Sequence, residues 1–278
     1  MSCEPIASLK YQPGVPLPEW ENMYNLIDAL NQSNGAGDPI PSIWRQWVEH
    51  GLELRRGSLH LMAAGPGVGK SVVALTMALK CGVPTLYMCA DTDAFTTTTR
   101  MASALTHRPL TDIQAAFAAG EADPYKKMIK EIQHIKWDFN GQPTVEDVYN
   151  NAEAFAHQYG EYPHLIIVDN LSNVFSDEDD MSALRHISEQ LNLLARETQS
   201  AVLTLHHLTG EYESGDIPPP LGALIGKVSK IPAVIVNLFR ASSGDMGFCI
   251  VKNRFGDAAP NGKLRAYVPM ALETMTLG

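Results

Sequence analysis

The sequence Ala63-Ala64-Gly65-Pro66-Gly67-Val68-Gly69-Lys70-Ser71 stands between an apolar stretch at 58–63 and a segment of helical periodicity at 71–82. Glycines in such a turn let backbone N–H groups face phosphate oxygens, where larger side chains would collide. The N-terminus of the following helix adds a dipole that favours anions. Lys70 is positioned to reach the β- and γ-phosphates of a nucleotide, and the Ser71 hydroxyl to bind Mg²⁺. Residues 65–71 are therefore predicted to bind a nucleotide, although Ala64 replaces the first glycine of the strict pattern.

Strand and helix patterns alternate through the rest of the chain. Besides 58–63, apolar or alternating stretches predict strands at 85–89, 134–139, 164–170, 201–207, 234–239 and 247–253. Helical patterns follow at 71–82, at 144–160 behind a capping box of Thr144 and Asp147, and from Leu184 to Leu194. This alternation predicts an α/β fold with a mostly parallel central sheet and helices on both faces.

Two segments do not fit the alternation. Residues 1–40 are rich in Pro, Gly and Asn around a short amphipathic segment, Trp20 to Leu30, and predict an arm or linker that contains a short helix. Residues 208–226 contain three adjoining prolines and predict a long irregular loop. We therefore expect an arm over 1–40 and one α/β core over 41–278.

Charge and cysteine content restrict the class of protein. The 278 residues carry 31 acidic and 21 basic side chains, and the net charge of −10 argues against a general nucleic-acid binder. Most of the acidic residues lie between 108 and 207, so the net charge does not exclude a local polynucleotide channel in the C-terminal third. The four cysteines are scattered, the N-terminus has no signal-peptide pattern, and the apolar stretches are too short to cross a membrane. We expect a cytoplasmic protein without a membrane partner.

Asp169 is the candidate magnesium carboxylate. It lies near the C-terminal end of the continuous apolar stretch His164 to Asn170, which is typical of a strand covered on both faces. A carboxylate at the C-terminal end of such a strand faces the same crevice as the glycine-rich loop and can hold Mg²⁺ through water. Aspartates at strand ends are common by themselves, and it is the loop upstream that favours the magnesium role.

The chain resembles the RecA-like ATPases, especially the C-terminal motor domain of DnaB-type replicative helicases. The stretches that carry the resemblance are the loop ending in Gly69-Lys70-Ser71, residues 88–103, 165–174 and 206–209, and VKNRFG at 251–256. The resemblance implies a RecA-like P-loop ATPase core over 41–278 that hydrolyses ATP with Mg²⁺. It also implies assembly into a ring, expected to be a hexamer, or into a filament. Only about 40 residues precede the core, so the likeness is to a stand-alone motor of the phage or recombination type.

The resemblance assigns roles in hydrolysis. The family has a glutamate base at the end of its second strand, where this chain has Asp91, one methylene shorter. Asp93 could take that role instead, and Asp91 could simply be the N-cap of the next helix. His207 matches the residue that senses the γ-phosphate, whereas His206 is expected to be structural.

Basic residues in the C-terminal third match two further elements. Lys252 and Arg254 alternate with Val251 and Asn253, so they should project to the same side of a strand. In the family that side supplies charge to the active site of the neighbouring subunit. Lys227 and Lys230 lie in the segment that matches the DNA-facing loop. Both pairs could also be ordinary solvated cations.

Three functions remain open from the sequence. The first is an ATP-driven motor or recombination ATPase that acts on single-stranded or branched DNA. The second is a metal-dependent nuclease with a RecA-like core, in which the acidic run 177–180 and Asp169 would hold two metal ions. The third is a regulatory ATPase that binds protein partners, which suits the overall acidity. The acidic run itself is interpreted as a solvated face that would repel DNA.

Overall fold

The computed structural model describes residues 37–176, 180–226 and 228–278. The chain divides into two compact units, Met1–Asn34 and Gly35–Gly278, and the described residues belong to the second. Most of the acidic run (177–179) and Lys227 lie outside the described residues. The predicted division at residue 40 stays a prediction. Within the second unit Ile40 is buried, and its N–H donates to the Leu54 carbonyl at 2.7 Å.

The centre of the unit is an eight-stranded sheet with the order β3-β2-β4-β5-β1-β6-β7-β8. The strands are β1 (Ser58–Ala64), β2 (Thr85–Cys89), β3 (Ile135–Asp138), β4 (Leu165–Asp169), β5 (Ala201–His207), β6 (Val234–Arg240), β7 (Met246–Asn253) and β8 (Arg265–Val268). From β3 to β6 in this order the neighbours are parallel, and β7 and β8 are antiparallel additions. The predicted mostly parallel sheet is confirmed.

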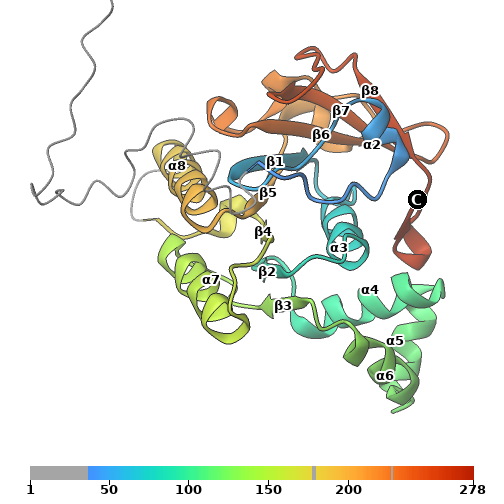
Figure 1. Cartoon of the computed structure of the whole chain (residues 1–278). Coiled ribbons are helices and arrows are strands. Elements are labelled where there is room, and N and C mark those ends of the chain that lie inside the picture. The colour runs from blue at the N-terminus through green and yellow to red at the C-terminus, as the bar shows by residue number, and fades with distance from the viewer. Residues whose placement is uncertain (1–36, 177–179, 227) are drawn as a thin grey trace, which may run out of the picture. The chain divides into compact units, whose positions relative to one another are not determined.

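Helices cover both faces of the sheet (Figure 1). The helix α3 (Lys70–Lys80) and the short α2 (Arg45–Glu49) pack on one face, and α7 (Val145–Tyr159) and α8 (Asp180–Thr198) pack on the other. In β4, Leu165 and Ile167 belong to the first core, while Ile166 and Val168 belong to the second. The strand is continuously apolar because both of its faces are buried.

The ends of α7 follow the capping signals in the sequence. The Thr144 hydroxyl accepts from the Asp147 N–H at 3.1 Å, and the Asp147 carboxylate accepts from the Thr144 N–H at 2.8 Å. Gly160, with a φ of 80°, ends the helix. This reciprocal pair satisfies two backbone donors that an uncapped helix would leave without partners.

A group of three helices beside the β3 edge is not evident in the hydrophobic pattern (Figure 1). They are α4 (Ala94–Thr106), α5 (Leu110–Ala118) and α6 (Asp123–Glu131), and their small shared core contains Ala102, Ile113 and Tyr125. A second, two-stranded sheet near the C-terminus pairs β9 (Met270–Ala271) with β10 (Thr276–Leu277). No helix within the described ranges has both the length and the apolar character needed to span a bilayer.

The segment predicted as a long loop is irregular but closely packed. It contains the 3-10 helices η2 (Gly210–Ser214) and η3 (Leu221–Ala223), and η4 (Val228–Lys230) follows. Leu208 and Leu224 are buried and pair in an isolated antiparallel bridge. The segment therefore passes over the carboxyl edge of the sheet as a fixed part of the unit.

Candidate nucleotide-binding site

The glycine-rich loop joins the end of β1 to the start of α3. Gly67 and Gly69 have φ values of 69° and 124°, a region that only glycine adopts without strain. A Cβ on Gly65 would lie 2.1 Å from the carbonyl oxygen of Glu213 in η2, so glycine is required there by close packing. The loop therefore has the conformation and the position, at a helix N-terminus, that phosphate binding requires.

Lys70 is held inside this loop. Its side chain is only 8% exposed, and its Nζ donates to the carbonyls of Ala64 and Gly65 at 3.1 and 3.3 Å. Burial lowers the pKa of Lys70, while the carboxylates of Asp169 and Asp91 oppose that shift. The ammonium group thus lies next to the predicted phosphate position with two nearby anions to keep it charged.

Asp169 ends β4 with an incompletely satisfied carboxylate. The residue is 1% exposed, its Oδ2 accepts from the Tyr87 hydroxyl at 3.1 Å, and its Oδ1 has no hydrogen-bond partner among the described residues. Burial raises the pKa of Asp169, and the nearby hydroxyls of Ser71 and Tyr87 oppose the shift. A buried oxygen without a partner is costly, and a water molecule bound to Mg²⁺ would satisfy it. Asp169 and Ser71 together therefore fit a hydrated magnesium ion.

His207 lies between two hydrogen-bond donors. Its Nδ1 is 3.4 Å from Lys70 Nζ, and its Nε2 is 3.3 Å from Asn170 Nδ2. The Asn170 oxygen is already used, because it accepts from the Ser172 N–H at 2.9 Å. Burial and then Lys70 lower the pKa of His207, and a neutral imidazole accepts at one nitrogen only. The other ring nitrogen carries an N–H, for which neither Lys70 Nζ nor Asn170 Nδ2 is an acceptor. An incoming phosphate oxygen would supply one.

His206, by contrast, is part of the core. It is fully buried, and its Nε2 donates to the Ile225 carbonyl at 2.8 Å. Burial lowers its pKa to about 4, so the ring is neutral at physiological pH. The contact holds the segment after β5 against the sheet, which is the structural role expected from the sequence.

The two aspartates after β2 have different surroundings. Asp93 is the N-cap of α4: its Oδ1 accepts from the Thr96 N–H at 2.9 Å and its Oδ2 from the Thr96 hydroxyl at 2.7 Å. Asp91 is exposed at the cavity, and its backbone N–H is 3.2 Å from the Asp169 carbonyl oxygen. The N-cap role considered for Asp91 therefore belongs to Asp93, and Asp91 is the freer of the two to act on a water molecule.

Lys70, Ser71, Asp91, Asp93 and His207 line one cavity of about 720 Å³, and Asp169 and Ser71 line a smaller one. The wall of the larger cavity consists of loop residues between Pro66 and Val72, the residues 91–93 that follow β2, Thr96 and Arg100 of α4, His207, and two C-terminal apolar side chains, Leu272 and Met275. The phosphate end is polar, whereas Leu272 and Met275 offer an apolar surface suited to a nucleobase. These two residues were not predicted from the sequence, because a distant hairpin brings them to the loop and no local pattern marks them.

Lys252 and Arg254 lie together, away from the loop of their own subunit. Lys252 Nζ donates to the carbonyls of Ser229 and Lys230 at 2.7 and 3.0 Å, and Arg254 Nη2 donates to the Lys230 carbonyl at 3.3 Å. Lys252 pairs with Ile235 near the start of β6, whereas the loop follows the opposite end of the parallel neighbour β1. Both side chains lie beside the exposed Lys230, and neither of them lines this chain's own nucleotide cavity.

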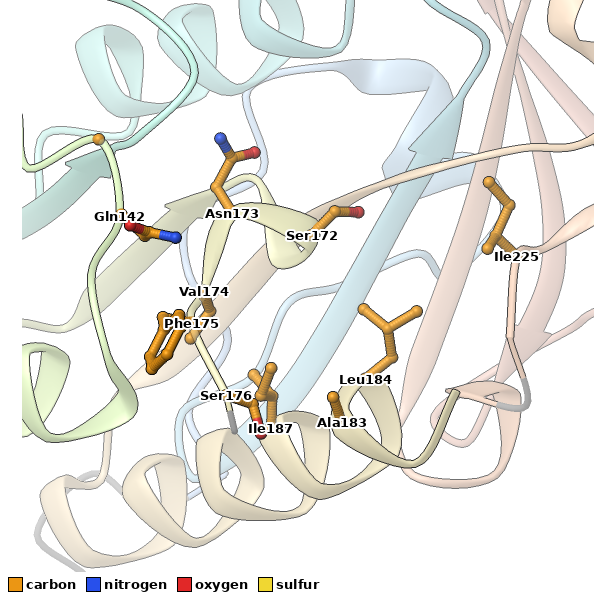
Figure 2. A pocket seen from close by; sticks show the side chains of 11 residues that line it. Gln142, Ser172, Asn173, Val174, Phe175, Ser176, Ala183, Leu184, Ile187 and Ile225 are labelled. Carbon is orange, nitrogen blue, oxygen red and sulfur yellow. The ribbon is translucent and has the colours of Figure 1, made fainter. Parts of the chain in front are cut away.

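A second cavity of about 660 Å³ opens beyond β4 (Figure 2). Residues of the segment from Ser172 to Ser176 line one side of it and residues of α8 line another, and Gly141, Gln142 and Ile225 complete the wall. Among the described residues, none that lines it is charged. Polynucleotide binding depends on cations that neutralise phosphates, so this described wall gives a DNA role no support. Within the described residues there is also no cluster of three or more His, Cys, Asp or Glu side chains that could hold a metal ion.

A glycine-rich loop between a parallel strand and a helix, beside a buried aspartate at the end of the next strand but one in the sheet, defines a P-loop ATPase domain. The chain belongs to the family described as AAA domain, which matches residues 33–211. It is similar to the Gene 65 protein of Mycobacterium phage L5, with 37% identity over 264 residues, 92% of this chain and 98% of the relative. The Gene 65 protein of Mycobacterium phage D29 is 35% identical over 227 residues, 78% of this chain and 97% of the relative.

Two solved structures share the fold. One is described as an ATPase domain, and it superposes with a TM-score of 0.75 at 17% identity, over 91% of this chain and 95% of that chain. The other is a DnaB-like replicative helicase, solved in a study of its interactions with primase. It gives a TM-score of 0.76 at 18% identity, over 91% of this chain and 64% of that chain. The predicted RecA-like fold of the DnaB type is confirmed.

Proposed function

We propose that this protein is an ATP-driven motor that acts on DNA and hydrolyses ATP at interfaces between copies of the chain. The observation that carries the proposal is the separation of two sets of residues. Lys70, Asp91 and His207 line one cavity, whereas Lys252 and Arg254 lie at the opposite end of the sheet. Such a division suits a ring or filament, in which the second set completes the cavity of a neighbour.

The residues of the cavity suggest a mechanism for hydrolysis. The loop N–H groups and Lys70 would hold the β- and γ-phosphates, and Ser71 and Asp169 would hold Mg²⁺, which neutralises phosphate charge when bound. Asp91 would orient the attacking water and accept its proton. His207 would donate its free N–H to a γ-phosphate oxygen, and Arg254 and Lys252 of the adjoining copy would stabilise the charge that develops.

The role of Asp91 is tested against that of Asp93. Asp91→Asn should leave ATP binding intact and lower its turnover by roughly 10²–10⁴-fold, the usual effect of losing a positioned base. Asp93→Asn keeps a side-chain oxygen that can cap α4, so its turnover should stay close to that of the wild type. Phosphate release and nucleotide affinity measured on both variants decide the assignment. The reverse ranking would move the base to Asp93.

The pH dependence of turnover tests Lys252. Burial, followed by the charge of Arg254, lowers the pKa of Lys252 to about 8. The ammonium is charged below this pH and loses its proton as the pH rises through it, so kcat should fall on the alkaline side with a midpoint near 8. Lys252→Arg retains a guanidinium that stays charged to roughly pH 12, so this fall should disappear. An alkaline fall at the same pH in the variant would assign it to another group.

The DNA part of the proposal depends on stimulation and salt. Single-stranded or branched DNA should raise the ATP turnover of the full chain, and DNA retention should weaken steeply as salt increases. Lys230 is exposed beside Lys252 and Arg254 and is a candidate phosphate contact, as is Lys227 outside the described residues. A turnover that is unaffected by DNA, together with no salt-dependent retention, would favour a regulatory ATPase with protein partners. Cleavage of DNA that persists in Lys70→Ala would favour a nuclease.

A further inference from the structure

Arg240 contacts the nucleotide-binding loop from outside the cavity. It ends β6, its Nε donates to the Val68 carbonyl at 3.3 Å, and its Nη2 donates to the Gly67 carbonyl. Its side chain does not line the nucleotide cavity, and no ion pair among the described residues involves it. The guanidinium therefore carries an unpaired charge directly behind the loop.

The geometry of the peptide group connects these contacts to phosphate binding. The Val68 carbonyl and the Gly69 N–H belong to one planar, trans peptide group, so they point in opposite directions. Arg240 binds the carbonyl end, and Gly69 itself lines the cavity. The hydrogen bond thus fixes the rotation of a peptide group whose N–H is directed away from Arg240, toward the space where phosphate would bind.

Arg240 also ties the loop to the segment after β5. Its backbone N–H donates to the Gly215 carbonyl at 2.6 Å. A Cβ on Gly215 would lie 2.2 Å from Val68 Cγ2, so this segment packs directly on the loop. Arg240 therefore joins β6, the nucleotide-binding loop and the segment after β5 at the edge of the sheet where the nucleotide would bind.

We propose that Arg240 is a positioning residue for the triphosphate site: it holds the Gly69 amide toward the phosphates and adds a positive charge behind the loop. The proposal rests on the proposed ATPase function of this loop. Arg240 donates hydrogen bonds to the Gly67 and Val68 carbonyls and does not line the cavity. Its loss should therefore affect the affinity for ADP and ATP more than the chemical step.

The test compares Arg240→Ala, Arg240→Lys and the control Arg265→Ala in the full chain, with a fluorescent ADP analogue as the probe. Arg265 makes a similar side-chain contact, with its Nε donating to the Gly262 carbonyl at 2.7 Å, but it does not touch the loop. Arg240→Ala should weaken ADP binding roughly tenfold, the effect of losing hydrogen bonds from a charged group. Arg240→Lys should recover part of the affinity, and Arg265→Ala should bind like the wild type.

Two further readouts separate positioning from a general loss of structure. In Arg240→Ala the KM for ATP should rise about tenfold while kcat changes less than about threefold. Amide hydrogen exchange at residues 65–71 should accelerate, with the thermal midpoint of the nucleotide-free protein within a few degrees of wild type, as expected for an exposed side chain. Wild-type ADP affinity in Arg240→Ala, or an equal loss in Arg265→Ala, would overturn the inference. Failure of the wild type to bind ADP at all would instead refute the proposed function.

Discussion

Lys70→Ala should reduce ATP turnover to background, a loss of at least roughly 10³-fold. The Lys70 ammonium lies inside the loop, bound to the Ala64 and Gly65 carbonyls and next to His207, and no other side chain of the described loop supplies a cation. Removing it leaves the γ-phosphate without the cation that the loop itself supplies, and the other cation of the cavity, Arg100, comes from α4. Asp169→Asn should also lower hydrolysis strongly, and more than it weakens nucleotide binding.

Steady-state phosphate release measures this effect, and Lys80→Ala provides a matched control. Lys80 is on the same helix α3, but its Nζ donates to the carbonyls of Leu277 and Gly278, away from the loop. That variant should keep a turnover close to that of the wild type. Unchanged turnover in both Lys70→Ala and Asp169→Asn would contradict the assignment of the nucleotide site.

Arg254→Ala should bind ATP normally and turn it over roughly 10³–10⁵-fold more slowly, the range found for a charge supplied in trans in related phosphoryl transfer. The reason is its position. Arg254 is exposed, and it is held by the Lys230 carbonyl near the end of the sheet opposite the loop. Within one subunit it is remote from the phosphates, but in an assembly it can face those of a neighbour.

Mixing two inactive variants tests this sharing directly. A mixture of Arg254→Ala and Lys70→Ala should recover part of the activity, because some interfaces then join an intact loop with an intact arginine. Recovery stays partial if a ring needs all of its sites in sequence. The control replaces Lys70→Ala with the double variant Lys70→Ala/Arg254→Ala, which cannot form an intact interface with Arg254→Ala. Equal activity in the two mixtures, or full turnover by Arg254→Ala alone, would show that Arg254 is not part of the active site.

The parts of the fold that the sequence predicted are those governed by local physics. The strand from Leu165 to Asp169 is apolar throughout because it is buried on both faces, and the capping box of Thr144 and Asp147 is satisfied within one helical turn. The loop from Gly65 to Ser71 combines conformational and chemical requirements in one short run of consecutive residues, so a single sequence reveals it. The antiparallel direction of β7 was not evident, because periodicity does not encode strand direction, and the four-residue strand β8 was not predicted at all.

The missed parts of the site depend on tertiary contacts. Arg240 is far from the loop in sequence and reaches it only because β6 lies beside β1 in the sheet. Leu272 and Met275 reach the cavity from the C-terminal hairpin. The choice between Asp91 and Asp93 also required the fold, since both are acidic residues before one helix and only Asp93 caps it. Helices α5 and α6 are short, and their few core contacts leave a weak pattern in the sequence.

In the proposed mechanism, each complete ATPase site is shared between two copies of the chain. The most direct measurement is the ATP turnover per subunit of the wild type, with saturating ATP, Mg²⁺ and single-stranded DNA, from nanomolar to micromolar protein. We predict a steep rise with protein concentration that reaches a plateau once the copies assemble. A turnover per subunit that is the same at every concentration, from a protein that stays monomeric throughout, would contradict a shared site.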